Sequence, residues 1–356
     1  MIETHVVNTF LATAVRAESW FAVLNYFNGL VAPSFLFIAG FVQGMSWSVA
    51  PGKPVAFARR ARHLLGIGAI GYALHFPWTE IGQHRWEAAW RIGSQVDVLQ
   101  CIAASLGLLL IVTWLAQKIG ARNVTGRERS PSVPLYLPPA GEMVWWIGVT
   151  ALLALAVFPA PLAAHWNPAA IPLRAWVNFS TGSWFPLFPW AGFVFVGALT
   201  GAAFRVGERA GDASLADASA APLPKPRLAT TFGLHPAALL PPLPLALSAW
   251  AWSSIGGHSP VSPASFLERT AWALALAALC QWLAARRRLP SLVLFAGKHS
   301  LTLYVAHLVL ISSLVGWGVP GQAFSIAGVL GLIAVVAPVS LVVTWLISRL
   351  RGFHRG

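Results

Sequence analysis

The stretch SLVLFAGKHSLTLYVAHLVLISS, residues 291–313, has the length and composition of a helix that crosses a membrane. About 20 mostly apolar residues are enough to span the hydrocarbon core of a bilayer. The same stretch contains three ionisable side chains: Lys298, His299 and His307. Ionisable groups inside a membrane span are costly, and they persist mainly where they line a cavity or meet a partner. The stretch therefore predicts a membrane helix that contributes to a polar site.

The whole chain has the composition of an integral membrane protein. Of its 356 residues, 57% are hydrophobic and 10% are charged, whereas a soluble globular domain has about 25% charged residues. This balance excludes a soluble fold, which needs a polar surface. We predict an all-α, polytopic transmembrane helix bundle with nine full spans, at residues 24–48, 61–78, 97–116, 142–160, 184–204, 233–252, 266–285, 291–313 and 325–348. Residues 1–15 are apolar but too short to cross, and we expect them to form the outer end of a truncated first span.

Basic residues alternate from loop to loop. Of the 24 Lys and Arg residues, 19 fall on one side of the predicted spans and 5 on the other. Loops rich in Lys and Arg stay in the cytoplasm, so we place that side and the C-terminus there, in a multi-pass protein of the cell membrane. The net charge of +13 then reflects topology and contact with anionic lipid. We predict the lipid bilayer as a partner and no nucleic acid.

We interpret residues 1–356 as a single transmembrane domain. Within it, residues 206–231 are rich in Ala, Pro, Ser and Gly, which is typical of a flexible linker, here on the cytoplasmic side. Cys101 and Cys280 each lie in an apolar run and behave as small buried hydrophobes. No paired Cys or His spacing indicates a metal, so we assign no metal site.

Helical geometry groups the polar residues of span 291–313. Successive residues are about 100° apart around a helix, so Ser300, Tyr304 and His307 form one polar stripe. Lys298 points away from His307 on such a helix, and we expect it to serve the cytoplasmic end.

A second set of polar residues is expected near the outer membrane surface. With the orientation above, these residues share one level: His5, Asn25, Asn28, His75, Asp97, Gln100 and His307. Simpler roles stay open, because a His near a span end can be interfacial and Asp97 can cap the helix that follows it.

Four stretches, in this order, resemble the catalytic region of heparan-alpha-glucosaminide N-acetyltransferases and their bacterial relatives: NGLVAPSFLFIAGF (28–41), DVLQCIAASLGLLLI (97–111), WFPLFPWAGFVFVGAL (184–199) and GKHSLTLYVAHLVLI (297–311). The resemblance covers nearly the whole chain, and in MIETHVVN it places His5 where bacterial relatives have a His. It implies a multi-span acyltransferase of the bacterial inner membrane. Such an enzyme takes an acetyl or other acyl group from acyl-CoA, usually acetyl-CoA, on the cytoplasmic side and passes it to an amine or hydroxyl of a sugar or glycan at the outer face.

Acyl transfer needs a base, donors for the oxyanion and positioning of two substrates. We assign His5 as the base or transient acyl acceptor, oriented by Asp97 or Glu3, with His307 on the acyl path. The substrate-binding set that we expect is Asn25, Asn28, Gln100, Ser300 and Tyr304. Lys298 and His299 are expected to contact the phosphates of CoA. The oligomeric state stays open.

The alternative hypothesis is a proton-coupled transporter or exporter. His, Asp and Lys groups within membrane spans also occur in proton relays. The absence of a matching pair of half-sequences favours the enzyme.

Overall fold

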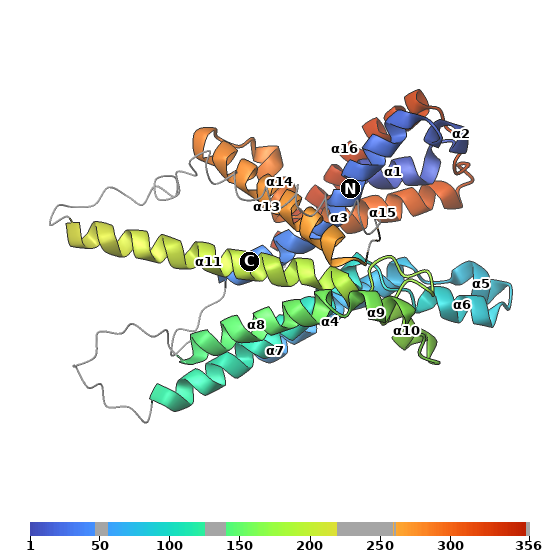
Figure 1. Cartoon of the computed structure of the whole chain (residues 1–356). Helices are drawn as coiled ribbons and strands as arrows, with labels where there is room; N and C mark the ends of the chain where they lie inside the picture. The colour runs from blue at the N-terminus through green and yellow to red at the C-terminus, as the bar shows by residue number, and fades with distance from the viewer. Residues whose placement is uncertain (47–55, 125–139, 219–258, 260, 354–356) are drawn as a thin grey trace. The chain divides into compact units, whose positions relative to one another are not determined.

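A computed structural model describes residues 1–46, 56–124, 140–218, 259 and 261–353 (Figure 1). Within these ranges the regular structure is α-helix and no strand forms, which confirms the all-α prediction. The chain divides into two compact units, and each is described by itself. Unit 1 combines Met1–Ala32 with Leu283–Gly356, and unit 2 is Pro33–Trp282.

Unit 1 contains both ends of the chain. Its helices are α1 (Ile2–Phe10), α2 (Thr13–Arg16), the first part of α3 (Ser19–Ser46), α14 (Ser291–Lys298), α15 (Ser300–Gly316) and α16 (Ile326–Phe353). Unit 2 contains the rest of α3, α4 (Phe57–Leu74), α5 (Trp78–Gly82), α6 (Trp86–Gly93), α7 (Val98–Val124), α8 (Ala140–Val157), α9 (Ala160–His165), α10 (Ile171–Val177), α11 (Leu187–Ala218) and most of α13 (Pro263–Arg286).

Five of the described helices are long and apolar enough to cross a membrane: Ser19–Ser46, Val98–Ala121, Ala140–Val157, Leu187–Arg205 and Ile326–Leu350. The bent pair α14 and α15 makes a sixth if it counts as one span. Large apolar side chains on these helices face outward; Ile147 and Leu155 on α8 are each 61% exposed. In a bilayer these side chains contact lipid tails, so their exposure does not place apolar surface in water.

The predicted number of nine spans is therefore not reached in the described residues. The helix predicted at 61–78 forms as α4, which ends at Leu74. Its first turns contain Arg59, Arg60 and Arg62, and these charges make it too polar to count as a candidate membrane span. The helix predicted at 266–285 forms as α13, but Glu268 and Arg269 lie within it and it also falls short of the required apolarity. The span predicted at 233–252 lies outside the described residues.

The region predicted as a linker begins as helix. Residues 206–218 continue α11, and residues 219–231 lie outside the described ranges. Small residues such as Ala are also strong helix formers, so a composition rich in Ala did not separate linker from helix here.

The span predicted at 291–313 is not continuous. It breaks at His299 into α14 and α15, whose axes differ by 82°. The inference that Lys298 points away from His307 assumed one straight helix, and this assumption is wrong. Tyr304 and His307 both lie in α15, so their predicted common face does not depend on the break.

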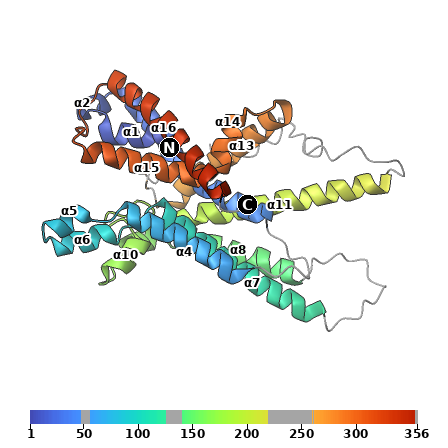
Figure 2. The same cartoon turned by 180° about the vertical axis from the view of Figure 1, so that it is seen from behind.

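Apolar side chains hold α1 against the C-terminal helices of unit 1. Val6, Val7 and Phe10 of α1 pack in one cluster with Ile311 of α15 and Val329 of α16. The three helices lie close together in both views (Figure 2). This packing fixes the position of α1, which is too short to be stable alone in water.

Backbone hydrogen bonds lock the end of α1. Ala12 N–H donates to the carbonyl of Phe324, and Phe324 N–H donates to that of Phe10, both at 2.9 Å. The Arg16 guanidinium donates to carbonyls in the last turn of α1 and just after it, those of Val7 (3.0 Å), Asn8 (2.7 Å) and Leu11 (2.9 Å). Arg16 thereby supplies donors to carbonyls at the helix end, where few backbone N–H groups are available; the Val7 carbonyl also accepts from the Leu11 N–H at 3.1 Å.

In unit 2, α3 and α11 cross with their backbones in contact. Each helix offers two glycines four residues apart: Gly40 and Gly44 on α3, and Gly197 and Gly201 on α11. A Cβ atom at Gly197 would collide with the carbonyl oxygen of Phe37, and one at Gly40 with that of Val194. Small residues at this spacing are the usual means of close helix packing in membranes, where van der Waals contact replaces the hydrophobic effect.

We predict that Gly197→Leu separates α3 from α11. The new side chain collides with backbone, which cannot rotate away, so the loss of stability should equal or exceed the ~1–3 kcal/mol typical of overpacking. The measurement is the midpoint of thermal unfolding in detergent. Gly107→Leu on α7 is the matched control, because a Cβ atom at Gly107 meets nothing within 4 Å. Equal midpoints for the two variants would contradict the close crossing.

Candidate functional site

Three rings meet at the centre of unit 1. His5 projects from α1, and Tyr304 and His307 project from α15. The ring centroids of His5 and His307 are 5.2 Å apart, those of His5 and Tyr304 are 6.1 Å apart, and those of Tyr304 and His307 are 5.4 Å apart. Residues from opposite ends of the chain therefore form one cluster, and two of its three rings are imidazoles.

The hydrogen bonding of His307 determines which ring nitrogen carries the proton. Nδ1 lies 2.9 Å from the carbonyl oxygen of Leu303. A carbonyl can only accept, so Nδ1 is the protonated nitrogen, and Nε2 of the neutral ring holds a lone pair. This Nε2 is buried and has no hydrogen-bond partner among the described residues. An orphaned buried polar atom costs about 1–3 kcal/mol, so it calls for a functional or ligand-based explanation.

A second contact ties α1 to α3 within unit 1. The Asn28 side-chain amide donates to the Glu3 carboxylate at 3.4 Å, and the Thr4 hydroxyl donates to it at 3.3 Å. Glu3 is thus held two residues from His5 on the same helix. Of the two carboxylates proposed to orient His5, Glu3 is the one that belongs to the same unit.

The remaining predicted residues of unit 1 are more exposed. Asn25 is exposed on α3, and Ser300 is exposed at the first position of α15. Lys298 is exposed at the end of α14, and the His299 ring packs on Phe295 with centroids 4.7 Å apart. Lys298 and His299 therefore lie together at the break between α14 and α15.

Unit 2 contains a separate polar cluster where α4 ends and α7 begins. The His75 Nε2 atom lies 3.8 Å from the Asp97 carboxylate, and its Nδ1 lies 3.3 Å from the Gly71 carbonyl. The Gln100 side-chain oxygen accepts from the Asp97 backbone N–H at 3.2 Å. The Gln100 Nε2 atom is buried and has no partner among the described residues. His75, Asp97 and Gln100, which the sequence placed at one level, do come together.

Asp97 has a structural role as well. It directly precedes α7, and the bond from its N–H to Gln100 is half of a capping box. The preceding residue, Val96, is held by a neighbouring loop: its N–H donates to the Ser183 hydroxyl at 3.0 Å, and its carbonyl accepts from Trp184 and Phe185, both at 3.1 Å. The loop thereby fixes the backbone from which the Asp97 carboxylate faces His75.

The two clusters share one design. In each, an imidazole Nδ1 faces the carbonyl four residues earlier, Leu303 for His307 and Gly71 for His75. The other nitrogen lies 3.8 Å from the Asp97 carboxylate in unit 2, and in unit 1 it is buried without a partner among the described residues. Whether both clusters line a single cavity, as the sequence predicts, stays a prediction, since they belong to different units.

Gly71 is a site residue that the sequence analysis missed. A Cβ atom there would lie 2.5 Å from the Gln100 side-chain oxygen and 3.0 Å from the Cβ atom of Leu99. The absent side chain leaves room for Gln100. A glycine one helical turn before a polar His was the available signal.

The described side chains include no group of three or more His, Cys, Asp or Glu residues that could hold a metal ion. Comparison of the chain with protein-family models, curated proteins and solved structures gives no match.

We predict that Gly71→Ala displaces Gln100 and weakens the contact between α4 and α7. The stability should fall by about 1–3 kcal/mol, the usual result of overpacking. The control is Gly68→Ala on the same helix, where the new Cβ atom meets only Ala103, at 3.7 Å; it should be neutral or stabilising by ~0.5–1 kcal/mol. Thermal unfolding of both variants in detergent measures the difference. A Gly71→Ala variant as stable as Gly68→Ala would rule out the tight packing around Gln100.

Proposed function

We propose that the chain is a membrane-embedded acyltransferase whose reacting centre is the cluster of His5, Tyr304 and His307. The observation that carries this proposal is the buried Nε2 lone pair of His307, which has no partner in the described residues and lies beside the ring of His5. Because the neutral His307 ring keeps a lone pair on Nε2, it can accept a proton from the neighbouring His5 ring, so the two imidazoles together can act as a base near neutral pH. The resemblance of the four sequence stretches is what selects acyl transfer among the reactions that need such a base.

The proposed step starts with the acceptor, an amine or hydroxyl of a sugar or glycan. His5 removes its proton, and the oxygen or nitrogen forms a bond to the thioester carbonyl carbon of an acyl-CoA. The carbon–sulfur bond then breaks, and the thiolate takes up the proton to leave as free CoA. In a two-step variant, a His5 nitrogen forms the bond to the acyl carbon, the carbon–sulfur bond breaks, and the thiolate leaves as CoA with the proton that His5 releases through His307. The acceptor oxygen or nitrogen then forms its bond to the acyl carbon, the bond from this carbon to His5 breaks, and the acceptor proton returns to His5.

The other residues of unit 1 suit supporting roles in this scheme. Glu3, held by Asn28, is suited to hold α1, and with it His5, against α3. The Tyr304 hydroxyl can donate to a developing oxyanion. Lys298 and His299 form a polar group at the break between α14 and α15, suited to phosphate groups of acetyl-CoA or another acyl-CoA.

Asn25, Asn28 and Gln100 remain proposed ligands of the acceptor. Asp97, which the sequence suggested as a residue that orients His5, has a different proposed role. Its carboxylate lies 3.8 Å from the His75 Nε2 atom, so we propose that Asp97 positions His75. If so, Asp97→Ala and His75→Ala should lower activity equally, and the double variant no further.

We predict that His5→Ala and His307→Ala each reduce acyl transfer by about 10²–10⁴-fold, the usual contribution of a general base. The measurement is transfer of label from acetyl-CoA to added glucosamine and to the glycolipid fraction in membranes that contain equal amounts of each variant. His165→Ala is the control, because His165 is exposed on α9 in unit 2. Full activity in His5→Ala, Asp97→Ala and His307→Ala alike would refute the assignment, and so would a wild-type protein that transfers no label.

The second candidate is a proton-coupled transporter. Two observations favour it: the His75–Asp97 pair and the 82° break between α14 and α15, since discontinuous helices form substrate and ion sites in transporters.

If the enzyme proposal is right, the protein should not move protons without an acyl donor. Proteoliposomes with an entrapped pH-sensitive dye and an imposed membrane potential test this, with protein-free vesicles as the control. We expect equal rates of internal pH change in both. A faster rate that is lost in Asp97→Ala would favour the transporter instead.

A further inference from the structure

A short helical hairpin, α5 and α6, joins the ends of α4 and α7 in unit 2. The basic residues of α4 lie in its first turns, at Arg59, Arg60 and Arg62, and Lys118 lies near the other end of α7. The hairpin is therefore at the end of this helix pair that is opposite to the basic residues. Under the positive-inside rule this end faces the outer leaflet.

The hairpin presents exposed aromatic side chains. Phe76 is 46% exposed, and three tryptophans of α5 and α6 are more than half exposed: Trp78, Trp86 and Trp90. Trp is enriched at the membrane–water interface because its ring is apolar and its N–H is polar. A helix with such an apolar face and a charged face lies in the interfacial plane. These observations indicate contact with lipid.

A hollow of about 820 Å³ lies beside this hairpin. Its walls are mainly aromatic rings and prolines, contributed by Tyr72, Phe76, Pro77, Trp86, Trp90 and Pro172. Its one Ser, Ser94, already donates its hydroxyl to the Trp90 carbonyl at 2.7 Å. The size is typical of small-ligand sites, and the lining suits an apolar chain.

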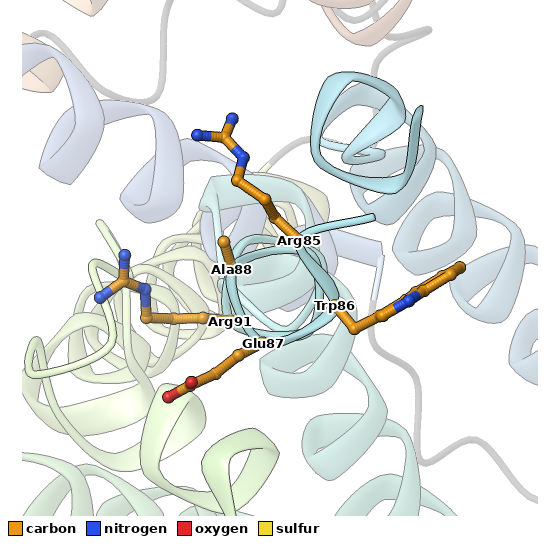
Figure 3. A pocket seen from close by; sticks show the side chains of 5 residues that line it. All are labelled: Arg85, Trp86, Glu87, Ala88 and Arg91. Carbon is orange, nitrogen blue, oxygen red and sulfur yellow. The ribbon is translucent and has the colours of Figure 1, made fainter. Parts of the chain in front are cut away.

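A smaller hollow of about 450 Å³, also lined by Trp86, contains charged groups of both signs (Figure 3). Glu87 and Arg91 project to the same side of α6, and Arg85 projects elsewhere. Arg85 pairs with Glu80 at 3.5 Å. Arg91 and Glu87 therefore provide one positive and one negative group on α6, on another side of the helix from Trp86, which lines both hollows.

We propose that the α5–α6 hairpin binds a phospholipid of the outer leaflet with a phosphoethanolamine headgroup. An acyl chain occupies the aromatic hollow, Arg91 contacts the phosphate, and Glu87 contacts the ammonium group. A purely anionic headgroup would bring like charge to Glu87, whereas a headgroup with both charges matches both side chains. This site is independent of the proposed acyl transfer.

The test uses the full chain in nanodiscs made from equal amounts of phosphatidylethanolamine and phosphatidylglycerol of identical acyl chains. Native mass spectrometry then identifies the lipids that stay bound after the disc is removed. We expect phosphatidylethanolamine to be enriched several-fold on the wild-type protein. The double variant Trp86→Ala, Trp90→Ala should lose most bound lipid, and Glu87→Gln should lose the headgroup preference but keep lipid.

Trp166→Ala is the matched control, because Trp166 is a tryptophan of unit 2 that is 55% exposed and does not line the hollow. It should retain the wild-type lipid. Three results would each overturn the proposal: no enrichment of phosphatidylethanolamine on the wild-type protein, unchanged preference in Glu87→Gln, or equal lipid loss in Trp166→Ala and in the double variant. The Glu87→Gln change is on the surface, so the test does not depend on whether the tryptophan variant folds.

Discussion

Scarcity of water inside the membrane bundle is the constraint on which the rest of the structure depends. A polar group there must find its partner within the protein, and most hydroxyls do so on their own helix. Ser105, Thr113 and Ser340 each donate to the carbonyl four residues earlier, at 2.7 Å. The same bond forms at Nδ1 of His307 and His75. Hydroxyls are satisfied by this arrangement, whereas an imidazole has a second nitrogen that must be directed elsewhere.

The surroundings of that second nitrogen differ between the two polar clusters. In unit 2 it faces the carboxylate of Asp97, an arrangement that serves both the start of α7 and the orientation of His75. In unit 1 the corresponding nitrogen of His307 is buried beside another imidazole. Two neighbouring imidazoles in a low-dielectric site cannot both be positively charged at little cost. The His5–His307 pair is thus suited to share one additional proton, as the proposed base would.

The sequence indicated several parts of this arrangement correctly. The helical period grouped Tyr304 with His307, and the level of the spans grouped His75, Asp97 and Gln100. It did not predict the break at His299. The one helix-breaking residue nearby is Gly297, two positions earlier, and an apolar run of this length is typical of a straight span. It also predicted that α4 and α13 are apolar enough to cross a membrane. Their charged residues lie inside the helices and not beyond their ends, so neither reaches that apolarity.

Composition and the length of the apolar runs by themselves determined that this is a helical membrane protein, because a run of about 20 apolar residues can cross lipid as a helix that satisfies its own backbone hydrogen bonds. They also identified the residue types able to move a proton. Only the tertiary structure decided which of these residues meet: His5 joins Tyr304 and His307 because α1 packs on α15 and α16 through Val6, Val7 and Phe10. Only the structure showed that α3 and α11 touch through glycines. The reason is that periodicity defines the faces of one helix, whereas the choice of partner depends on the shapes of two surfaces at once.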